Sequence, residues 1–176
     1  MSRPVTFRIP ASTANLGAGF DALSLALARY LRISIQPADE MAIEVKGLDA
    51  ALIPTTEDNL ICKVAAATAK RRKRSLPPYL LKIDNNIPLA RGMGSSASAI
   101  IAGITCYEAL AGDWLSEQEI YRCAWEFESH PDNLAAAHKR QNKTAEARAA
   151  LRKIQKPEAA VFLQMGLLSL GEDNLA

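Results

Sequence analysis

The sequence predicts an α+β fold in which helices cover one face of a largely antiparallel sheet, followed by a C-terminal α-helical hairpin. Two periodicities lead to this prediction. The first third of the chain alternates apolar and polar residues, as half-buried strands do, and the middle spaces its apolar residues three or four apart, as amphipathic helices do. The chain has 176 residues, of which 49% are hydrophobic, and this is enough to build one buried core.

Alternating and β-branched residues indicate where the strands lie. We expect strands over residues 4–10, 23–36, 41–46 and 79–84. The first should end at Pro10, because the small, hydroxyl and glycine residues of 11–21 are typical of a loop. The second should break near Arg29 and Tyr30. We expect the early strands to form an antiparallel meander.

Start and stop signals indicate three helices, over residues 57–74, 96–110 and 116–127. In the first helix, Glu57 and Asp58 lie in the first turn, and apolar residues repeat at helical spacing. Its expected buried face consists of Ile61, Val64, Ala65 and Thr68. The second helix, which is made of small and apolar residues, should be buried and should end at Gly112. The third begins with a capping box formed by Ser116 and Glu119. Its expected buried stripe consists of Ile120, Cys123, Ala124 and Phe127.

Composition limits the classes of partner. The net charge of +2 and the pI near 8.5 give no electrostatic reason to expect a nucleic acid or a membrane as partner. The basic run over residues 70–74 has no interleaved aromatic residue, so a solvated helix end is favoured over a nucleic-acid or targeting signal. Three widely spaced cysteines and an N-terminus without an apolar signal core lead us to expect a cytoplasmic protein.

The stretch over residues 86–106 predicts a phosphate-binding loop followed by a helix. Its glycines let a ligand approach the backbone, and the helix directs unpaired N–H groups toward the loop. A Walker loop is excluded because no lysine follows Gly94. A dinucleotide fingerprint fits Gly92, Gly94 and Ala97 formally, with Asp113 downstream, but a polar turn precedes it where a buried strand is required. A tight turn into a helix of small residues stays open.

Three segments resemble motifs of the GHMP kinases, the superfamily of galactokinase, homoserine kinase and mevalonate kinase. Residues 88–97, with GMGSSA, resemble the second motif, and residues 10–27, PASTANLGAGFDALSLAL, resemble the first motif in the form found in homoserine kinases. The segment ESHPDN over residues 128–133 resembles the EGHPDN of homoserine kinases, with Ser129 in place of the glycine. The resemblance implies a fold similar to domain 2 of ribosomal protein S5.

The resemblance also implies ligands and site residues. ATP would bind to Pro88, Ala90, Arg91, Gly92, Met93, Gly94, Ser95, Ser96 and Ala97. Mg²⁺ would be held by Ser96 and Glu128. L-homoserine would be positioned by Asn15, Asp21, His130 and Asn133. Asp21 and Asp132 are the catalytic candidates, and whether either acts as a general base is left open. The implied reaction is Mg·ATP-dependent phosphorylation of the L-homoserine hydroxyl in threonine biosynthesis.

The resemblance ends at about Ala137, where homoserine kinases continue into a second domain. We therefore expect a kinase N-terminal domain over residues 1–137 and a helical tail of unknown role over residues 138–176. The tail should form an αα-hairpin from Thr144 onward. Two alternatives follow: an impaired kinase fragment that acts as an ATP-binding or protein-interaction module, and another small-alcohol kinase such as mevalonate kinase. A homodimer that completes the site is left open.

Overall fold

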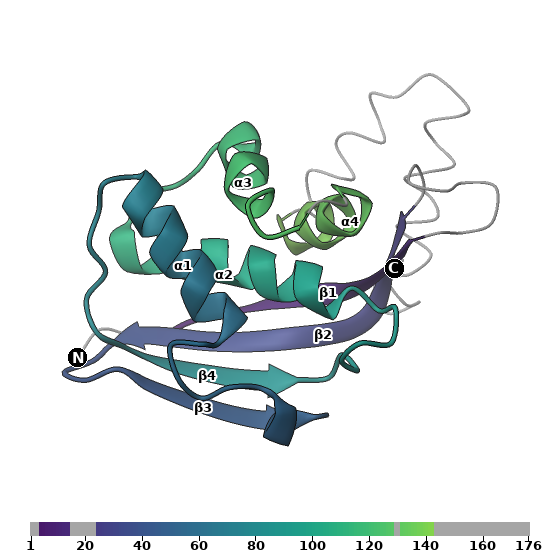
Figure 1. Cartoon of the computed structure of the whole chain (residues 1–176), viewed down its shortest axis with the longest axis horizontal. Coiled ribbons are helices and arrows are strands. Elements are labelled where there is room, and N and C mark those ends of the chain that lie inside the picture. The colour runs from purple at the N-terminus through teal and green to yellow at the C-terminus, as the bar shows by residue number, and fades with distance from the viewer. Residues whose placement is uncertain (1–3, 15–23, 129–130, 143–176) are drawn as a thin grey trace, which may run out of the picture.

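The structure, a computed structural model, describes residues 4–14, 24–128 and 131–142. Its described part is an α+β fold with one four-stranded sheet and helices packed on one face, as predicted (Figure 1). In chain order the elements are β1 (Val5–Ala14), β2 (Ser24–Pro37), β3 (Ala42–Gly47), the 3-10 helix η2 (Ala50–Leu52), α1 (Leu60–Arg71), β4 (Tyr79–Asn85), α2 (Ser95–Ala111), α3 (Glu117–Ala124) and α4 (Pro131–Asn142). None of these described helices is long and apolar enough to cross a bilayer. The hairpin expected from Thr144 onward lies outside the described residues.

The strand order β1-β2-β4-β3 differs from the predicted meander. β2 pairs antiparallel with β1, as expected, but its other neighbour is β4, also antiparallel, where the meander would have placed β3. β4 therefore lies between β2 and β3, and it runs parallel to β3. A parallel neighbour requires a crossover connection, and α1 provides it between β3 and β4. The meander was wrong because alternation locates strands but does not identify their neighbours. The ends of β3 and β4 consequently lie side by side at one edge of the sheet.

β1 continues past the proline at which we expected it to end. Its pairing with β2 shifts register after Pro10, which faces Tyr30, so that Ala11 faces Leu27. The break expected near Arg29 is therefore an irregularity within a continuous strand. The predicted loop is wrong for residues 11–14, which extend the strand. Ser12 is fully buried as a result.

α1 begins one turn later than predicted. Asn59 is its N-cap: its side chain accepts a hydrogen bond from the Ile61 N–H at 3.0 Å and donates one to the Pro54 carbonyl at 2.7 Å. Glu57 and Asp58 precede the helix, so the predicted acidic first turn is wrong. A buried asparagine that satisfies both backbone groups is a stronger start signal than the acidic pair. The predicted buried face, from Ile61 to Thr68, is confirmed.

α2 is buried between the sheet and the other helices, as predicted. Its interior residues are Ala97, Ser98, Ile100, Ile101, Ala102, Gly103, Ile104, Cys106, Tyr107 and Glu108. α1 approaches Gly103 closely: a Cβ at this position would lie 2.6 Å from the Ile61 carbonyl oxygen and 2.6 Å from the Val64 Cβ. The sequence of small residues therefore sets how closely the two helices pack.

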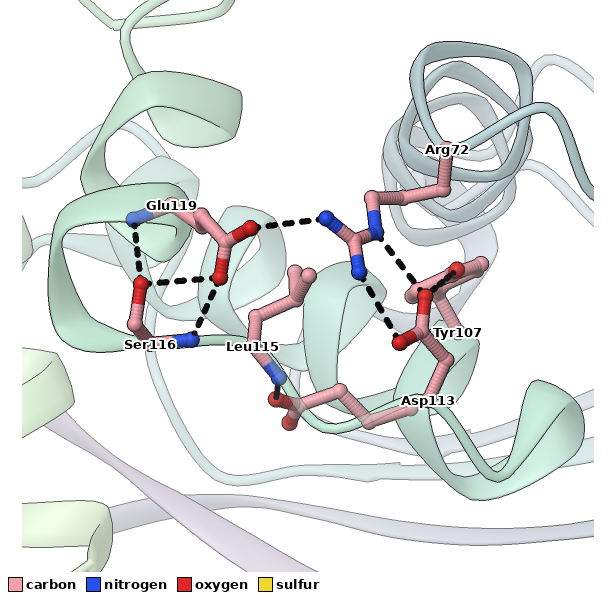
Figure 2. Close-up of polar contacts among 7 residues, drawn as sticks. Arg72, Tyr107, Asp113, Leu115, Ser116 and Glu119 are labelled. Atoms are coloured by element: carbon pink, nitrogen blue, oxygen red, sulfur yellow. Dashed lines mark hydrogen bonds and ion pairs between the residues drawn. The ribbon is translucent and has the colours of Figure 1, made fainter.

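A cluster of polar side chains joins the end of α1 to α3 (Figure 2). The Arg72 guanidinium donates to both carboxylate oxygens of Asp113, at 2.9 and 3.0 Å, and to Glu119 at 2.7 Å. The Tyr107 hydroxyl also donates to Asp113. Glu119 completes the predicted capping box with Ser116. The predicted solvated helix end is confirmed for the other four cations of residues 70–74, which are exposed. Arg72 is the exception, because its partners lie far away in the sequence and no local pattern reveals them.

We expect this cluster to make stability depend on pH under acidic conditions. Arg72 first, and then Tyr107, lower the pKa of Asp113 from 3.8 to about 2. The unfolded chain therefore takes up this proton first, so the stabilisation is present above about pH 4 and is lost as pH falls toward 2. In Arg72→Met the free energy of unfolding should vary less with pH across this range, as measured by urea denaturation. Arg32→Met, which removes an exposed 3.9 Å pair with Asp84, should keep the wild-type slope, and equal slopes in all three proteins would contradict the prediction.

Candidate functional site

The loop between β4 and α2 has a backbone suited to binding an anion. Ala90, Gly92 and Gly94 have positive φ values of 55°, 68° and 64°, and the residues between them have negative φ. Alternation of positive and negative φ favours an anion nest, the arrangement in which successive N–H groups point toward a common concavity. The two glycines adopt positive φ without strain, whereas Ala90 does so against its intrinsic preference.

The loop leads directly into the N-terminus of α2. Gly94 is the N-cap residue, and it has no side chain with which to cap the first turn. The N–H groups and the positive end of the helix dipole therefore face the loop without a competing serine or aspartate. Ser95 is half-buried and Ser96 is exposed, whereas Ala97 is buried in the core. Ala97 can thus offer a ligand only its backbone N–H.

Strand β1 holds the loop from one side. The Ser12 N–H donates to the Met93 carbonyl at 3.1 Å, and the Ser98 hydroxyl donates to the Pro10 carbonyl at 2.7 Å. Gly94 lies so close to the strand that a Cβ on it would be 2.1 Å from the Ser12 Oγ. The first and second predicted motifs are therefore in direct contact.

Helix α4 reaches the same point. The Ser12 hydroxyl donates to Oδ1 of Asn133 at 2.9 Å, which brings a residue of the third predicted motif to the loop. Ser12 was not among the predicted site residues. The only available signal was its place in the first motif, because a small polar residue in a supposed loop gives no indication of burial.

Asp49 holds the loop from the opposite side, and the sequence analysis also missed it. Its Oδ2 accepts the Leu89 N–H at 2.9 Å and pairs with the Arg91 guanidinium at 3.2 Å. Asp49 follows β3, and only the parallel pairing with β4 brings it beside the loop. The exposed side chain of Arg91 is thus oriented by a partner that the predicted meander did not identify.

A pocket of about 260 Å³ opens next to the start of α2. Its polar lining residues are Asn59, Asn85, Ser95 and Ser96, of which the two serines lie beside the loop. The apolar walls include Leu52, Ile53, Pro54, Leu60, Leu89 and Ala99. An apolar pocket next to an anion nest suits a ligand with a flat ring at one end and phosphates at the other. None of the six apolar residues was predicted.

The remaining predicted residues are only partly described. Asn15, Asp21 and His130 lie outside the described residues, as does the side chain of Asp132 in the first turn of α4. Pro88 is half-buried at the start of the loop. Glu128 is half-buried just after α3, and its N–H donates to the Ala124 carbonyl at 3.2 Å. Within the described ranges, no three His, Cys, Asp or Glu side chains come together as a metal site.

Comparison with known proteins agrees with this geometry. Residues 59–140 match the family model of the GHMP kinases N terminal domain. A homoserine kinase from Bacillus velezensis is 47% identical over 129 residues, which cover 73% of this chain and 42% of that protein. The chain therefore spans less than half the length of this curated relative.

Solved structures lead to the same family. A Listeria monocytogenes protein assigned as a homoserine kinase superposes with a TM-score of 0.65 at 42% identity, over 75% of this chain and 46% of that one. The mevalonate kinase of Methanococcus jannaschii superposes with a TM-score of 0.62 at 16% identity, over 95% of this chain and 71% of that one, and it shows the shared fold alone. The family-model match, the sequence relatives and the shared fold together identify residues 59–140 of this chain as part of the N-terminal domain of the GHMP kinase family.

Proposed function

We propose that this chain binds ATP and transfers its γ-phosphoryl group to the hydroxyl of L-homoserine. The observation that carries the proposal is the loop from Ala90 to Gly94, where alternating φ values and an uncapped helix N-terminus meet. Phosphoryl transfer depends mostly on positioning and on charge neutralisation, and this geometry supplies both to a phosphate chain. The 47% identity to a homoserine kinase supports this substrate over mevalonate.

The nucleotide would lie across the nest and the adjoining pocket. Backbone N–H groups of residues 92–97 would hold the phosphates, with Arg91 adding positive charge beside them. The adenine ring would occupy the pocket between Leu52 and Leu89, whose walls are mostly apolar. A pocket of about 260 Å³ accommodates a purine but not a whole nucleotide. The phosphates would therefore extend out to the loop.

Ser96 and Glu128 would hold Mg²⁺, because a hydroxyl and a carboxylate are the hard oxygen ligands that this ion prefers. The ion usually keeps few protein ligands and takes phosphate oxygens as well, which fits a region without a dense carboxylate cluster among its described residues. When bound, it would neutralise charge on the phosphates. The exposed position of Ser96 at the start of α2 leaves its hydroxyl accessible for this role.

Asn15, Asp21, His130 and Asn133 would position L-homoserine. Asn133 supports this placement, because its contact with Ser12 fixes it beside the loop. Asp21 and Asp132 remain the candidates for accepting the hydroxyl proton. We further propose that the reaction serves threonine biosynthesis in the cytoplasm, that residues 1–137 form the kinase domain and residues 138–176 a helical tail, and that a homodimer could complete the site.

A second candidate function is ATP binding without turnover. The chain spans 42% of its Bacillus velezensis relative, and any site residues in the rest of that protein would lie outside the matched region. A nucleotide site that lacks the groups around the transferred phosphoryl would bind ATP but would lose most transition-state stabilisation.

The test is ADP release by the purified chain with Mg·ATP and L-homoserine, with mevalonate in its place, and with neither. We expect turnover that requires L-homoserine and falls at least about 100-fold in Glu128→Ala, because Mg²⁺, which would neutralise charge on the phosphates, would lose one of its protein ligands. Glu126→Ala, which removes a carboxylate paired with Arg71 on the surface, should retain the activity. Nucleotide binding without turnover would favour the second candidate, and the absence of binding would exclude both.

A further inference from the structure

Three described residues other than glycine have positive φ, namely Asp49, Lys73 and Ala90, and two of them, Asp49 and Ala90, lie on facing segments. Asp49, between β3 and η2, has φ of 53°, and Ala90, in the phosphate loop, has φ of 55°. Such conformations are unfavourable for residues with a Cβ and persist only where surrounding contacts hold them. Ala90 is exposed, so packing of its own side chain does not fix it. The contacts that fix the loop must come from its neighbours.

Those contacts converge on one atom. Oδ2 of Asp49 accepts the Leu89 N–H at 2.9 Å and pairs with the Arg91 guanidinium at 3.2 Å. The two donors belong to the residues immediately before and after Ala90. One carboxylate oxygen thus bridges the left-handed residue, and a bond to an ionised acceptor is stronger than one between neutral groups.

The Asp49 backbone is itself fixed to the start of the loop. The Leu48 N–H donates to the Asn85 carbonyl at 2.7 Å, and the Asn85 side-chain amide donates to the carbonyls of Leu48 and Ile87, at 2.8 and 2.9 Å. A Cβ on Gly47 would overlap the Asn85 carbonyl oxygen at 2.1 Å. The carboxylate is therefore presented from a rigid support, with its side chain 21% exposed.

We propose that Asp49 is the positioning residue of the phosphate loop. Its carboxylate keeps Ala90 left-handed and so keeps the N–H groups of the nest aligned before a ligand arrives. The positive charge of Arg91 compensates the negative charge of the Asp49 carboxylate, so that this carboxylate does not repel an approaching phosphate. This inference rests on the proposed ATP binding and adds a residue that itself contacts no phosphate.

The test is calorimetric titration of Mg·ATP into the complete 176-residue chain and its variants. Asp49→Ala should raise Kd about ten-fold, because a charge-assisted bond that orders the loop is lost. Asp49→Asn should raise it no more than about three-fold, because the amide oxygen still accepts the Leu89 N–H and the exposed pair with Arg91 contributes little. Asp58→Asn, at an exposed carboxylate paired with Lys63, is the matched control and should not change Kd.

A rescue experiment separates positioning from a general structural effect. Adding Ala90→Gly to Asp49→Ala should recover most of the lost affinity, because glycine adopts positive φ without an anchor. Unchanged Kd in Asp49→Ala would overturn the inference and leave ATP binding intact, whereas wild-type protein that does not bind Mg·ATP would overturn both. If thermal unfolding shows that Asp49→Ala does not fold, Asp49→Asn decides: a rise in Kd of up to about three-fold that Ala90→Gly reverses would support the inference, whereas an unchanged Kd, or a rise that Ala90→Gly does not reverse, would overturn it.

Discussion

Replacing Gly94 by alanine should abolish Mg·ATP binding and lower the free energy of unfolding by about 2–4 kcal/mol. Two costs add at this position. The backbone has φ of 64°, and the new Cβ would lie 2.1 Å from the Ser12 Oγ and 3.0 Å from the Ser12 carbonyl oxygen. Ser12 is fully buried and bonded to Met93 and Asn133, so it cannot move aside without breaking those contacts. Urea denaturation and nucleotide titration measure the two effects.

Gly92→Ala is the matched control, because Gly92 lies in the same loop with φ of 68° but a Cβ there meets no described atom within 4 Å. It should cost only about 1 kcal/mol, the price of a left-handed alanine. Similar losses in both variants would show that backbone strain alone matters and that the contact with Ser12 does not hold the loop.

Gly103→Ala should lower the free energy of unfolding by about 2–3 kcal/mol, although the same change usually stabilises a helix interior by about 0.5–1 kcal/mol. The sign reverses because the new methyl group would lie 2.6 Å from both the Ile61 carbonyl oxygen and the Val64 Cβ. α1 would have to move away from α2, and the core between them would lose contacts. Thermal or urea unfolding measures the loss.

Gly112→Ala provides the comparison for this variant. Gly112 ends α2 with φ of 63°, and a Cβ there meets open space among the described atoms. Its cost should be about 1 kcal/mol and should come from the backbone alone. A Gly103→Ala protein that is as stable as the wild type would mean that the two helices are not held at the described distance.

Local signals predicted much of this structure. The buried face of α1, the buried character of α2, its end at Gly112 and the capping box at Ser116 all follow from patterns within a few residues. The positive φ values of Gly92 and Gly94 before α2 could also be expected, because glycine is the residue that adopts them without strain. These features depend on short-range sterics and hydrogen bonds, which short sequence patterns predict directly. The left-handed Ala90 could not be expected from the sequence.

Features that depend on distant neighbours were missed. The insertion of β4 beside β3 follows from a crossover, and strand alternation contains no information about it. Asp49 and Ser12 became site residues only because of that topology and the extension of β1. Arg72 likewise finds its partners 41 and 47 positions away. The candidate site thus combines a glycine-containing loop, which the local sequence predicts, with Asp49 and Ser12, which only the fold of the whole chain brings beside that loop.

The hydrogen bond between Ser12 and Asn133 joins residues 121 positions apart. Closing so long a segment is slow and entropically costly, so we expect this contact to form late in folding and, during synthesis, only after α4 has left the ribosome. Partly folded chains would then contain the loop between β4 and α2 but not the hydrogen bond between Ser12 and Asn133. A nucleotide that binds only the form with this contact made would stabilise the finished fold, by a free energy that grows with the logarithm of the free ligand concentration.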